Sequence, residues 1–176
     1  MKLFNWYLRW RHSHGFGVHS PFAFDFLCSE LRPPGGYAYY GYDMLPRSDK
    51  YSPGLLRLVF RVILRLRPHS ADTGSAGIDI RRTASLARPH IRFGEQHPEL
   101  MIIATDTDCD TARCRIGNRH MPHLIILPPY TQAKTAFWQH ALTQAVTGMS
   151  FGGKHSRALI FVADARLPRQ DFDITF

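Results

Sequence analysis

The feature that most limits the fold is the alternation of helical and extended patterns that begins at residue 55. Residues 55–66 (LLRLVFRVILRL) repeat apolar residues at helical spacing and place Arg57, Arg61 and Arg65 on the opposite face. Shorter patterned segments follow: a strand at 69–72, a helix at 78–88, strands at 101–106 and 123–129, a helix at 132–146, and strands at 157–163 and 171–176. This order predicts an α/β sheet.

Two further expectations concern the ends of this pattern. The LPRQ segment between the last two strands suits a turn, so we expect these strands to form a C-terminal antiparallel pair. We expect the three arginines of 55–66 to form a solvated stripe, with an RNA- or membrane-facing ridge as the alternative.

Residues 1–50 are expected to form a helical and aromatic cap segment on an α/β domain at 51–176. The stretch 19–31 (HSPFAFDFLCSEL) places Ser20 at a helix N-cap and Pro21 at the first helical position. Another short helix is expected at 4–14, which also contributes to a group of histidines and tryptophans: His12, His14, His19, Trp6 and Trp10.

Composition narrows the classes of partner. The chain has 176 residues and a net charge of +8, and a basic protein tends to bind polyanions, so nucleic acid is a candidate partner. No uninterrupted apolar run approaches the roughly 20 residues that span a bilayer, so no membrane association is expected. The start lacks the pattern of a signal peptide and the cysteines number three, which predicts reduced thiols in the cytoplasm.

Residues 71–79 (ADTGSAGID) contain the strongest candidate for a binding site. Asp72, Gly74, Ser75 and Gly77 form an acid-x-Gly-x-x-Gly turn between a predicted strand and a predicted helix, where glycines let the backbone approach a nucleotide. The next predicted strand ends in Asp106, whose carboxylate could accept hydrogen bonds from ribose hydroxyls. An ordinary turn between a strand and a helix is the structural alternative.

The triplet Asp-Thr-Gly at 72–74 also occurs in aspartic proteases. The chain has one such triplet, so a homodimer would have to supply the second aspartate. The residues before it, Arg67 to Ala71, are not a strongly hydrophobic strand. A dimeric aspartic protease is therefore only a remote alternative.

Several stretches together resemble a bacterial family of class I S-adenosylmethionine-dependent methyltransferase-like proteins. They are HGFGVHSPFAFDFL, YAYYGYDML and KYSPGLLRLVFRVILRLRP, followed by the glycine turn and the ending RALIFVADARLPRQDFDITF. The resemblance implies a Rossmann-like, methyltransferase-type sheet under an N-terminal helical cap that covers the substrate side. It also implies S-adenosylmethionine as cofactor, held by Asp72, Gly74, Ser75, Gly77 and Asp106.

The chain departs from the family pattern in ways that bear on activity. The strand before Asp72 is polar and short, and the strand at 123–127 ends in Leu127 rather than in an aspartate. LPPY at 127–130 is similar to the Asp/Asn-Pro-Pro-Tyr loop of amino-methyltransferases, but a leucine side chain cannot accept the hydrogen bond of a target amine. These changes favour a shortened or inactive relative as the alternative.

Metal and phosphate motifs are incomplete. Cys109, Cys114, His120 and His123 are a zinc-capable set with unusual spacing, and DTDCD at 106–110 starts like a calcium loop without its later residues. GMSFGGK at 148–154 lacks the helix that a phosphate loop needs. We therefore expect no metal, and we cannot assign a catalytic residue.

The sequence thus predicts transfer of a methyl group from S-adenosylmethionine to an unknown acceptor. The main alternative is a catalytically inactive methyltransferase-fold module that binds nucleic acid or protein through its basic surface.

Overall fold

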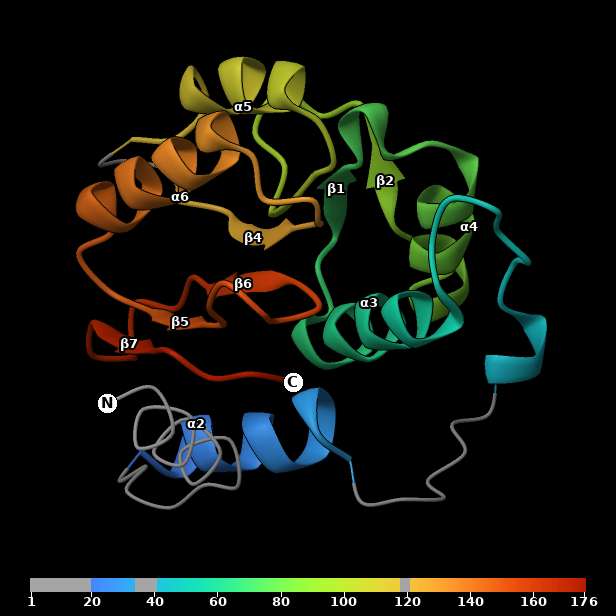
Figure 1. Cartoon of the computed structure of the whole chain (residues 1–176), viewed down its shortest axis with the longest axis horizontal. Coiled ribbons are helices and arrows are strands. Elements are labelled where there is room, and N and C mark those ends of the chain that lie inside the picture. Colours follow the sequence, from blue (N-terminus) through green and yellow to red (C-terminus); the bar gives the residue numbers. More distant parts are fainter. Residues whose placement is uncertain (1–19, 34–40, 118–120) are drawn as a thin grey trace.

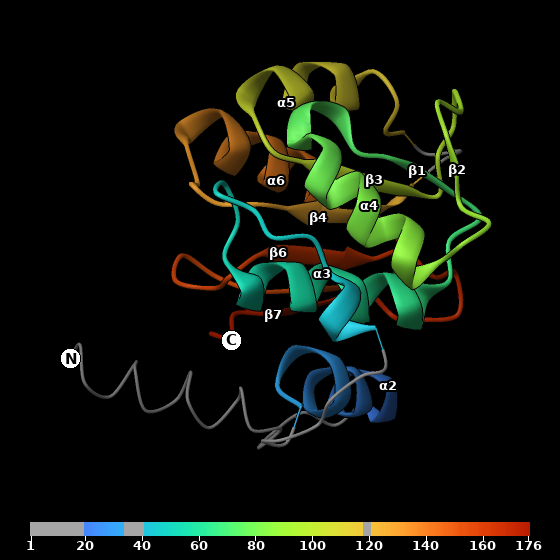
Figure 2. The same ribbon diagram turned by 90° about the vertical axis from the view of Figure 1, so that its right-hand side faces the viewer.

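A computed structural model describes residues 20–33, 41–117 and 121–176. A mixed sheet lies between two layers of helices, as Figures 1 and 2 show. Its strand order is β2-β1-β3-β4-β6-β5-β7. The strands are β1 (Ser70–Asp72), β2 (Arg92–Phe93), β3 (Leu100–Ile103), β4 (His123–Ile126), β5 (Met149–Phe151), β6 (Leu159–Val162) and β7 (Gln170–Phe172). The predicted α/β class is confirmed.

Five α-helices are described, and they divide between the two faces of the sheet. They are α2 (Pro21–Phe26), α3 (Pro53–Leu66), α4 (Ile78–Ala87), α5 (Asp106–Arg113) and α6 (Gln132–Gln144). One apolar cluster contains α2, α3 and α4, and a second contains α5 and α6. Alternate residues of a strand enter different clusters, as Ile102 and Ile103 do, because successive side chains of a strand point to opposite faces.

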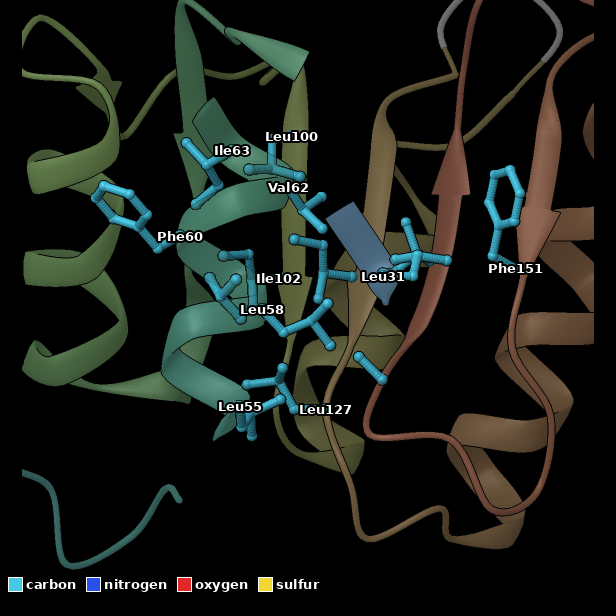
Figure 3. Close-up of a cluster of buried hydrophobic side chains, with 14 of the residues drawn as sticks. Leu31, Leu55, Leu58, Phe60, Val62, Ile63, Leu100, Ile102, Leu127 and Phe151 are labelled. Carbon is cyan, nitrogen blue, oxygen red and sulfur yellow. The ribbon is translucent and has the colours of Figure 1, made fainter. Parts of the chain in front are cut away.

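Helix α3 is the centre of the larger cluster. Its residues Leu58 and Val62 are at most 1% exposed and lie against Leu100 and Ile102 of β3 (Figure 3). Burial of each side chain of this size stabilises the fold by about 1.5–3 kcal/mol. The apolar face of the predicted helix at 55–66 is therefore the face that covers the sheet.

The sheet is mixed, with strands that run in both directions. Strands β2, β1, β3 and β4 are parallel, β6 is antiparallel to β4 and β5, and β7 is parallel to β5. The expected pairing of the last two strands is wrong, because β5 lies between β6 and β7 and pairs with both. Only three residues of β5 separate Gly148 from Gly152, too few for a clear alternating pattern.

The predicted N-terminal helix at 19–31 is confirmed from Ser20 onward. The Ser20 hydroxyl accepts a hydrogen bond from Ala23 N at 3.3 Å, and Pro21 is the first helical residue. A π-helical turn, Leu27–Leu31, continues α2. This helix covers the face of the sheet beside α3. The predicted helix at 4–14 and its histidines and tryptophans lie outside the described residues.

The arginine stripe of α3 is only partly the solvated stripe that we expected, because Arg57 and Arg65 are exposed whereas Arg61 is buried. Arg61 is 5% exposed, and it donates through Nε to the Glu30 carbonyl at 2.6 Å and through Nη1 to the Tyr42 hydroxyl at 2.7 Å. Arg65 forms an ion pair with Asp25 of α2. The stripe therefore attaches the N-terminal segment to the domain.

None of the described helices combines the length and the apolar character needed to cross a bilayer.

Candidate functional site at the carboxyl edge

The predicted glycine turn lies at the carboxyl end of β1. Asp72 ends the strand, Gly74–Ala76 form a single 3-10 turn, and Gly77 precedes α4. The chain leaves β1 through α4 on one face of the sheet and leaves the neighbouring β3 through α5 on the other. The ends of β1 and β3 therefore frame a topological switch point, where ligands of open α/β sheets bind.

The backbone of this turn is already hydrogen-bonded within the protein. Three successive N–H groups have acceptors: Gly74 N donates to Asp72 Oδ1 at 2.8 Å, Ser75 N to Asp108 Oδ1 at 2.9 Å, and Ala76 N to the Thr73 carbonyl at 2.9 Å. A phosphate or carboxylate ligand binds such a turn through free N–H groups. In this conformation these three groups are not available to a ligand.

Asp108 is the residue that closes the turn. Its Oδ2 atom accepts hydrogen bonds from Ala104 N at 2.9 Å, from Thr105 N at 2.8 Å and from the Ser75 hydroxyl at 2.8 Å. Burial by itself would raise the pKa of Asp108, but the hydrogen bonds from Ser75, Thr105 and Ala104 outweigh burial and lower it below its usual value. Asp108 is therefore a buried carboxylate that stays ionised at neutral pH.

The close approach of Asp108 explains the glycine at position 74. A Cβ atom on Gly74 would lie 2.5 Å from Asp108 Oδ1, which is closer than two such atoms can pack. The Cβ of a residue at Gly77 would meet nothing within 4 Å, but the backbone there has φ 87° and ψ −177°, a conformation essentially restricted to glycine. At 74 the glycine makes room for a protein carboxylate, whereas at 77 it allows the turn into α4.

The two acids predicted to hold the cofactor have partners on different elements. Asp72 forms an ion pair with Arg115, which follows α5. Asp106 is the first residue of α5, and its carboxylate accepts a hydrogen bond from the hydroxyl of Thr131, the N-cap of α6. Asp106 thus links two helix starts, and the acid that reaches the glycine turn is Asp108 instead.

The sequence offered one signal for Asp108 that we did not use. Thr105 and Asp108 have the spacing of a capping box, and both of its hydrogen bonds are present at the start of α5. A carboxylate at this position points back over the helix start, toward the neighbouring strand ends. Its contact with Ser75 depends on the pairing of β1 and β3, which a local pattern does not reveal.

The cavity beside Asp72 and Gly74 is small. Its volume is about 70 Å³, and it is lined by these two residues, by β3 and by Asp108. Pockets for drug-sized ligands and cofactors occupy about 300–1,000 Å³. In the present conformation the cavity that these described residues line is smaller than this range.

Lys134 holds the neighbouring strand ends together. The residue is 1% exposed, and its ammonium group donates hydrogen bonds to the Ala104 carbonyl, to the Leu127 carbonyl at 2.9 Å and to the Pro129 carbonyl at 3.1 Å. Burial lowers the pKa of Lys134. The Pro129 carbonyl of the LPPY loop is thus already an acceptor for the protein, and the Leu127 side chain is fully buried. Sequence analysis missed Lys134, because one lysine in an amphipathic helix gives no such signal.

The candidate zinc ligands that are described do not gather around one point. Cys109 is a buried residue of α5, Cys114 is exposed, and His123 accepts a hydrogen bond at Nδ1 from Ala163 N at 3.0 Å. His120 lies outside the described residues. Within the part of the chain that the structure describes, no group of three or more potential metal ligands is found.

No protein-family model matches the chain, and comparisons with curated proteins and with solved structures find no significant match. The interpretation of the site therefore rests on its own geometry and on the resemblance of the sequence segments described above.

Proposed function

We propose that the protein is a methyltransferase-like α/β domain that does not transfer methyl groups and that binds an acidic partner protein through a basic surface. The observation that carries the first part is the internal pairing of the turn N–H groups at Gly74, Ser75 and Ala76. A cofactor that used this turn would have to displace Asp108, whose charged hydrogen bonds are worth about 1.5–3 kcal/mol each.

The second part rests on a groove beside α4, which has a volume of about 490 Å³. Met44 and Ile78 line it and are 63% and 60% exposed, which is unusual for large apolar residues. The exposed arginines Arg81 and Arg82 line the same groove. An apolar surface bordered by two guanidinium groups is complementary to an amphipathic helix with acidic residues.

The same lining favours a protein over a nucleic acid. Proteins that bind single-stranded nucleic acid stack the bases on aromatic rings, in addition to contacting phosphates with basic residues. Among the described residues, the side chains that line this groove are aliphatic or basic, with one serine, Ser85. The net charge of +8 favours any acidic partner, but the apolar residues of the groove favour a helix with leucine-like side chains.

Transfer of a methyl group from S-adenosylmethionine is the second candidate function. The place of Asp72 and the glycine turn at the switch point between β1 and β3 favours it. In this case Asp108 would have to release Ser75 when the cofactor binds.

Calorimetric titration of the folded protein with S-adenosylmethionine and S-adenosylhomocysteine separates the two candidates. We expect no heat of binding from either compound. Saturable heat that is lost in Asp72→Ala would contradict the proposal and support the methyltransferase.

Binding of the partner is tested by the fluorescence anisotropy of a labelled 18-residue helix of leucine and glutamate. We expect saturable binding that weakens with salt and drops at least tenfold in the double variant Arg81→Glu/Arg82→Glu. The control variant Arg113→Glu/Arg166→Glu changes the net charge by the same amount at sites away from the groove. Its affinity for the peptide should fall much less. Binding of a labelled oligonucleotide in place of the peptide would overturn the choice of a protein partner.

A further inference from the structure

The structure contains a second cavity, of about 540 Å³, between α6 and the strands β5, β6 and β7. We infer that it is a binding site for a small organic cation, a primary amine with an apolar body. This inference does not depend on the glycine turn or on the α4 groove. The volume of the cavity lies within the range of small-molecule pockets.

The cavity lies where α/β sheets bind ligands. Tyr130 belongs to the loop that follows β4, and Gly152 to Lys154 follow β5. Because β4, β5 and β7 run in the same direction, all these residues are at the carboxyl edge of the sheet. In Figure 1, α6 lies over β4 and β6, toward the end of the sheet that β5 and β7 form.

One carboxylate that lines the cavity, Asp171, is 56% exposed and forms an ion pair with Arg169. Ser150 and Asp171 are register partners on β5 and β7, and both line the cavity. Asp171 Oδ1 accepts hydrogen bonds from the Ser150 hydroxyl and from Arg169 Nη1, the latter at 2.6 Å. Among the described residues, Oδ2 has no hydrogen-bond donor. One oxygen therefore fixes the side chain, and the other is available to a donor on a ligand.

Part of the cavity wall is apolar, although Thr135 and Gln139 of α6 also line it. Trp138 and Leu142 come from α6, and Leu159 comes from β6. Tyr130 also lines the cavity, and its hydroxyl donates a hydrogen bond of 2.8 Å to the Ser156 carbonyl. A ligand held here would place an apolar body of a few carbons or a ring between these side chains.

The charge of the ligand follows from Asp171. An ammonium group would gain both a hydrogen bond and a charge interaction with Oδ2, and charge-assisted hydrogen bonds are about twice as strong as neutral ones. Lys154 and Asp173 also line the cavity, and Lys154 and Asp171 are both exposed, so solvent screens both of these charges. The preference for an amine over an alcohol or acid of the same shape therefore rests on the charge-assisted hydrogen bond to Asp171 Oδ2.

The test uses 2-phenylethylamine as the probe and 2-phenylethanol as its neutral isostere. The chain has three tryptophans, so replacing Trp6 and Trp10 by Phe leaves Trp138, in the cavity wall, as the reporter. We expect saturable change of Trp138 fluorescence with the amine and at least tenfold weaker binding of the alcohol. Equal affinity for both compounds, or no saturable change with the amine, would overturn the inference.

Two variants test whether the change in Trp138 fluorescence arises from binding in the cavity. Asp171→Asn keeps an oxygen that can accept the hydrogen bond of Ser150 but removes the charge. It should weaken binding of the amine at least tenfold and leave binding of the alcohol unchanged. Gln139→Phe places a large ring at the cavity wall from an exposed helix position without adding a second tryptophan, and it should abolish binding of both compounds. Asp110→Asn, on the exposed side of α5, is the matched control. Unchanged amine affinity in Asp171→Asn would rule out the site.

Discussion

The carboxylate of Asp108 accepts hydrogen bonds from both the backbone N–H and the hydroxyl of Ser75, at 2.9 Å and 2.8 Å, across 33 positions of sequence. This contact joins the turn after β1 to the start of α5 at the switch point between β1 and β3. The same contact therefore stabilises the sheet edge and occupies the N–H group of Ser75.

Removal of the Asp108 carboxylate should destabilise the fold. Asp108→Ala leaves the N–H groups of Ser75, Ala104 and Thr105 without their acceptor, and each unsatisfied buried group costs about 1–3 kcal/mol. We expect the free energy of unfolding in urea to fall by about 3 kcal/mol. Asp110→Ala, on the same helix but exposed, should change it by less than about 0.5 kcal/mol. A loss below about 1 kcal/mol in Asp108→Ala would show that water replaces the carboxylate.

Gly74 and Asp108 should be energetically coupled. Gly74→Ala introduces a Cβ that collides with Asp108 Oδ1, and this collision disappears once Asp108 is replaced by alanine. A double-mutant cycle measured by urea unfolding should therefore give a cost for Gly74→Ala that is at least about 1 kcal/mol smaller in the Asp108→Ala background. Gly77→Ala, where the cost is backbone strain alone, should show no coupling to Asp108. Equal costs of Gly74→Ala in both backgrounds would contradict the collision.

Lys134 should be more important for stability than its position in a surface helix indicates. Lys134→Met removes the donor for the carbonyls of Ala104, Leu127 and Pro129 and leaves these groups without it in the interior. We expect a loss of about 3 kcal/mol in the free energy of unfolding. Lys154→Met, an exposed lysine, should cost less than about 0.5 kcal/mol. If the two variants were equally stable, a buried ammonium would not hold the strand ends.

Arg61 should control the attachment of the N-terminal segment. Arg61→Met removes the hydrogen bonds to the Glu30 carbonyl and the Tyr42 hydroxyl while keeping an apolar stem of similar length. We expect amide hydrogen exchange to become at least tenfold faster in residues 21–31 and to stay nearly unchanged in β3 and β4. Arg82→Met, an exposed arginine of α4, serves as the control. Uniform acceleration throughout the domain would mean that Arg61 supports the whole fold instead.

His123 should make stability fall as the pH decreases below neutral. Burial lowers the pKa of His123 to about 4, although the carboxylates of Glu99 and Asp164 oppose this shift. Between the usual pKa of 6.5 and about 4, the unfolded chain binds a proton that the folded chain does not, so acid favours unfolding. The loss reaches about 3 kcal/mol below pH 4.

The measurement for His123 is Tm as a function of pH from 7.5 to 4. His123→Asn keeps an acceptor for Ala163 N without a titrating ring, so its Tm should fall less steeply than that of the wild type. The low pKa of Asp108 adds a further loss at more acidic pH in both proteins, because a depressed carboxylate stabilises the fold only while it is ionised. Parallel curves for the two proteins would remove His123 from the explanation.

The long periodic elements could be predicted from the sequence, because each carries its signal locally. The predicted helices at 55–66 and 132–146 correspond to α3 and α6, and the predicted strand at 123–129 contains β4. Strands β2 and β5 were missed, since two or three residues are too few to show a period of two. These strands exist because their neighbours in the sheet provide hydrogen-bonding partners.

The site could be predicted only as far as local patterns extend. The turn from Asp72 to Gly77 lies at the carboxyl edge, as expected, because the strand before it and the helix after it determine its place. The partners of this turn come from elsewhere in the chain, such as Arg115, and depend on the order of the strands. Likewise, the spacing of the α3 arginines placed them on one face, but it did not show that Arg61 on this face is buried against a distant segment.

The shortness of the two outermost described strands has a consequence for the behaviour of the protein in concentrated solution. Strand β2 has two residues and β7 has three, and Arg92, Gln170 and Asp171 are exposed on them. A second molecule that approached either edge of the sheet could form only a few backbone hydrogen bonds with the edge strand, next to charged or polar groups. Self-association through added strands is therefore disfavoured, and fibril growth would first require the inner strands to separate.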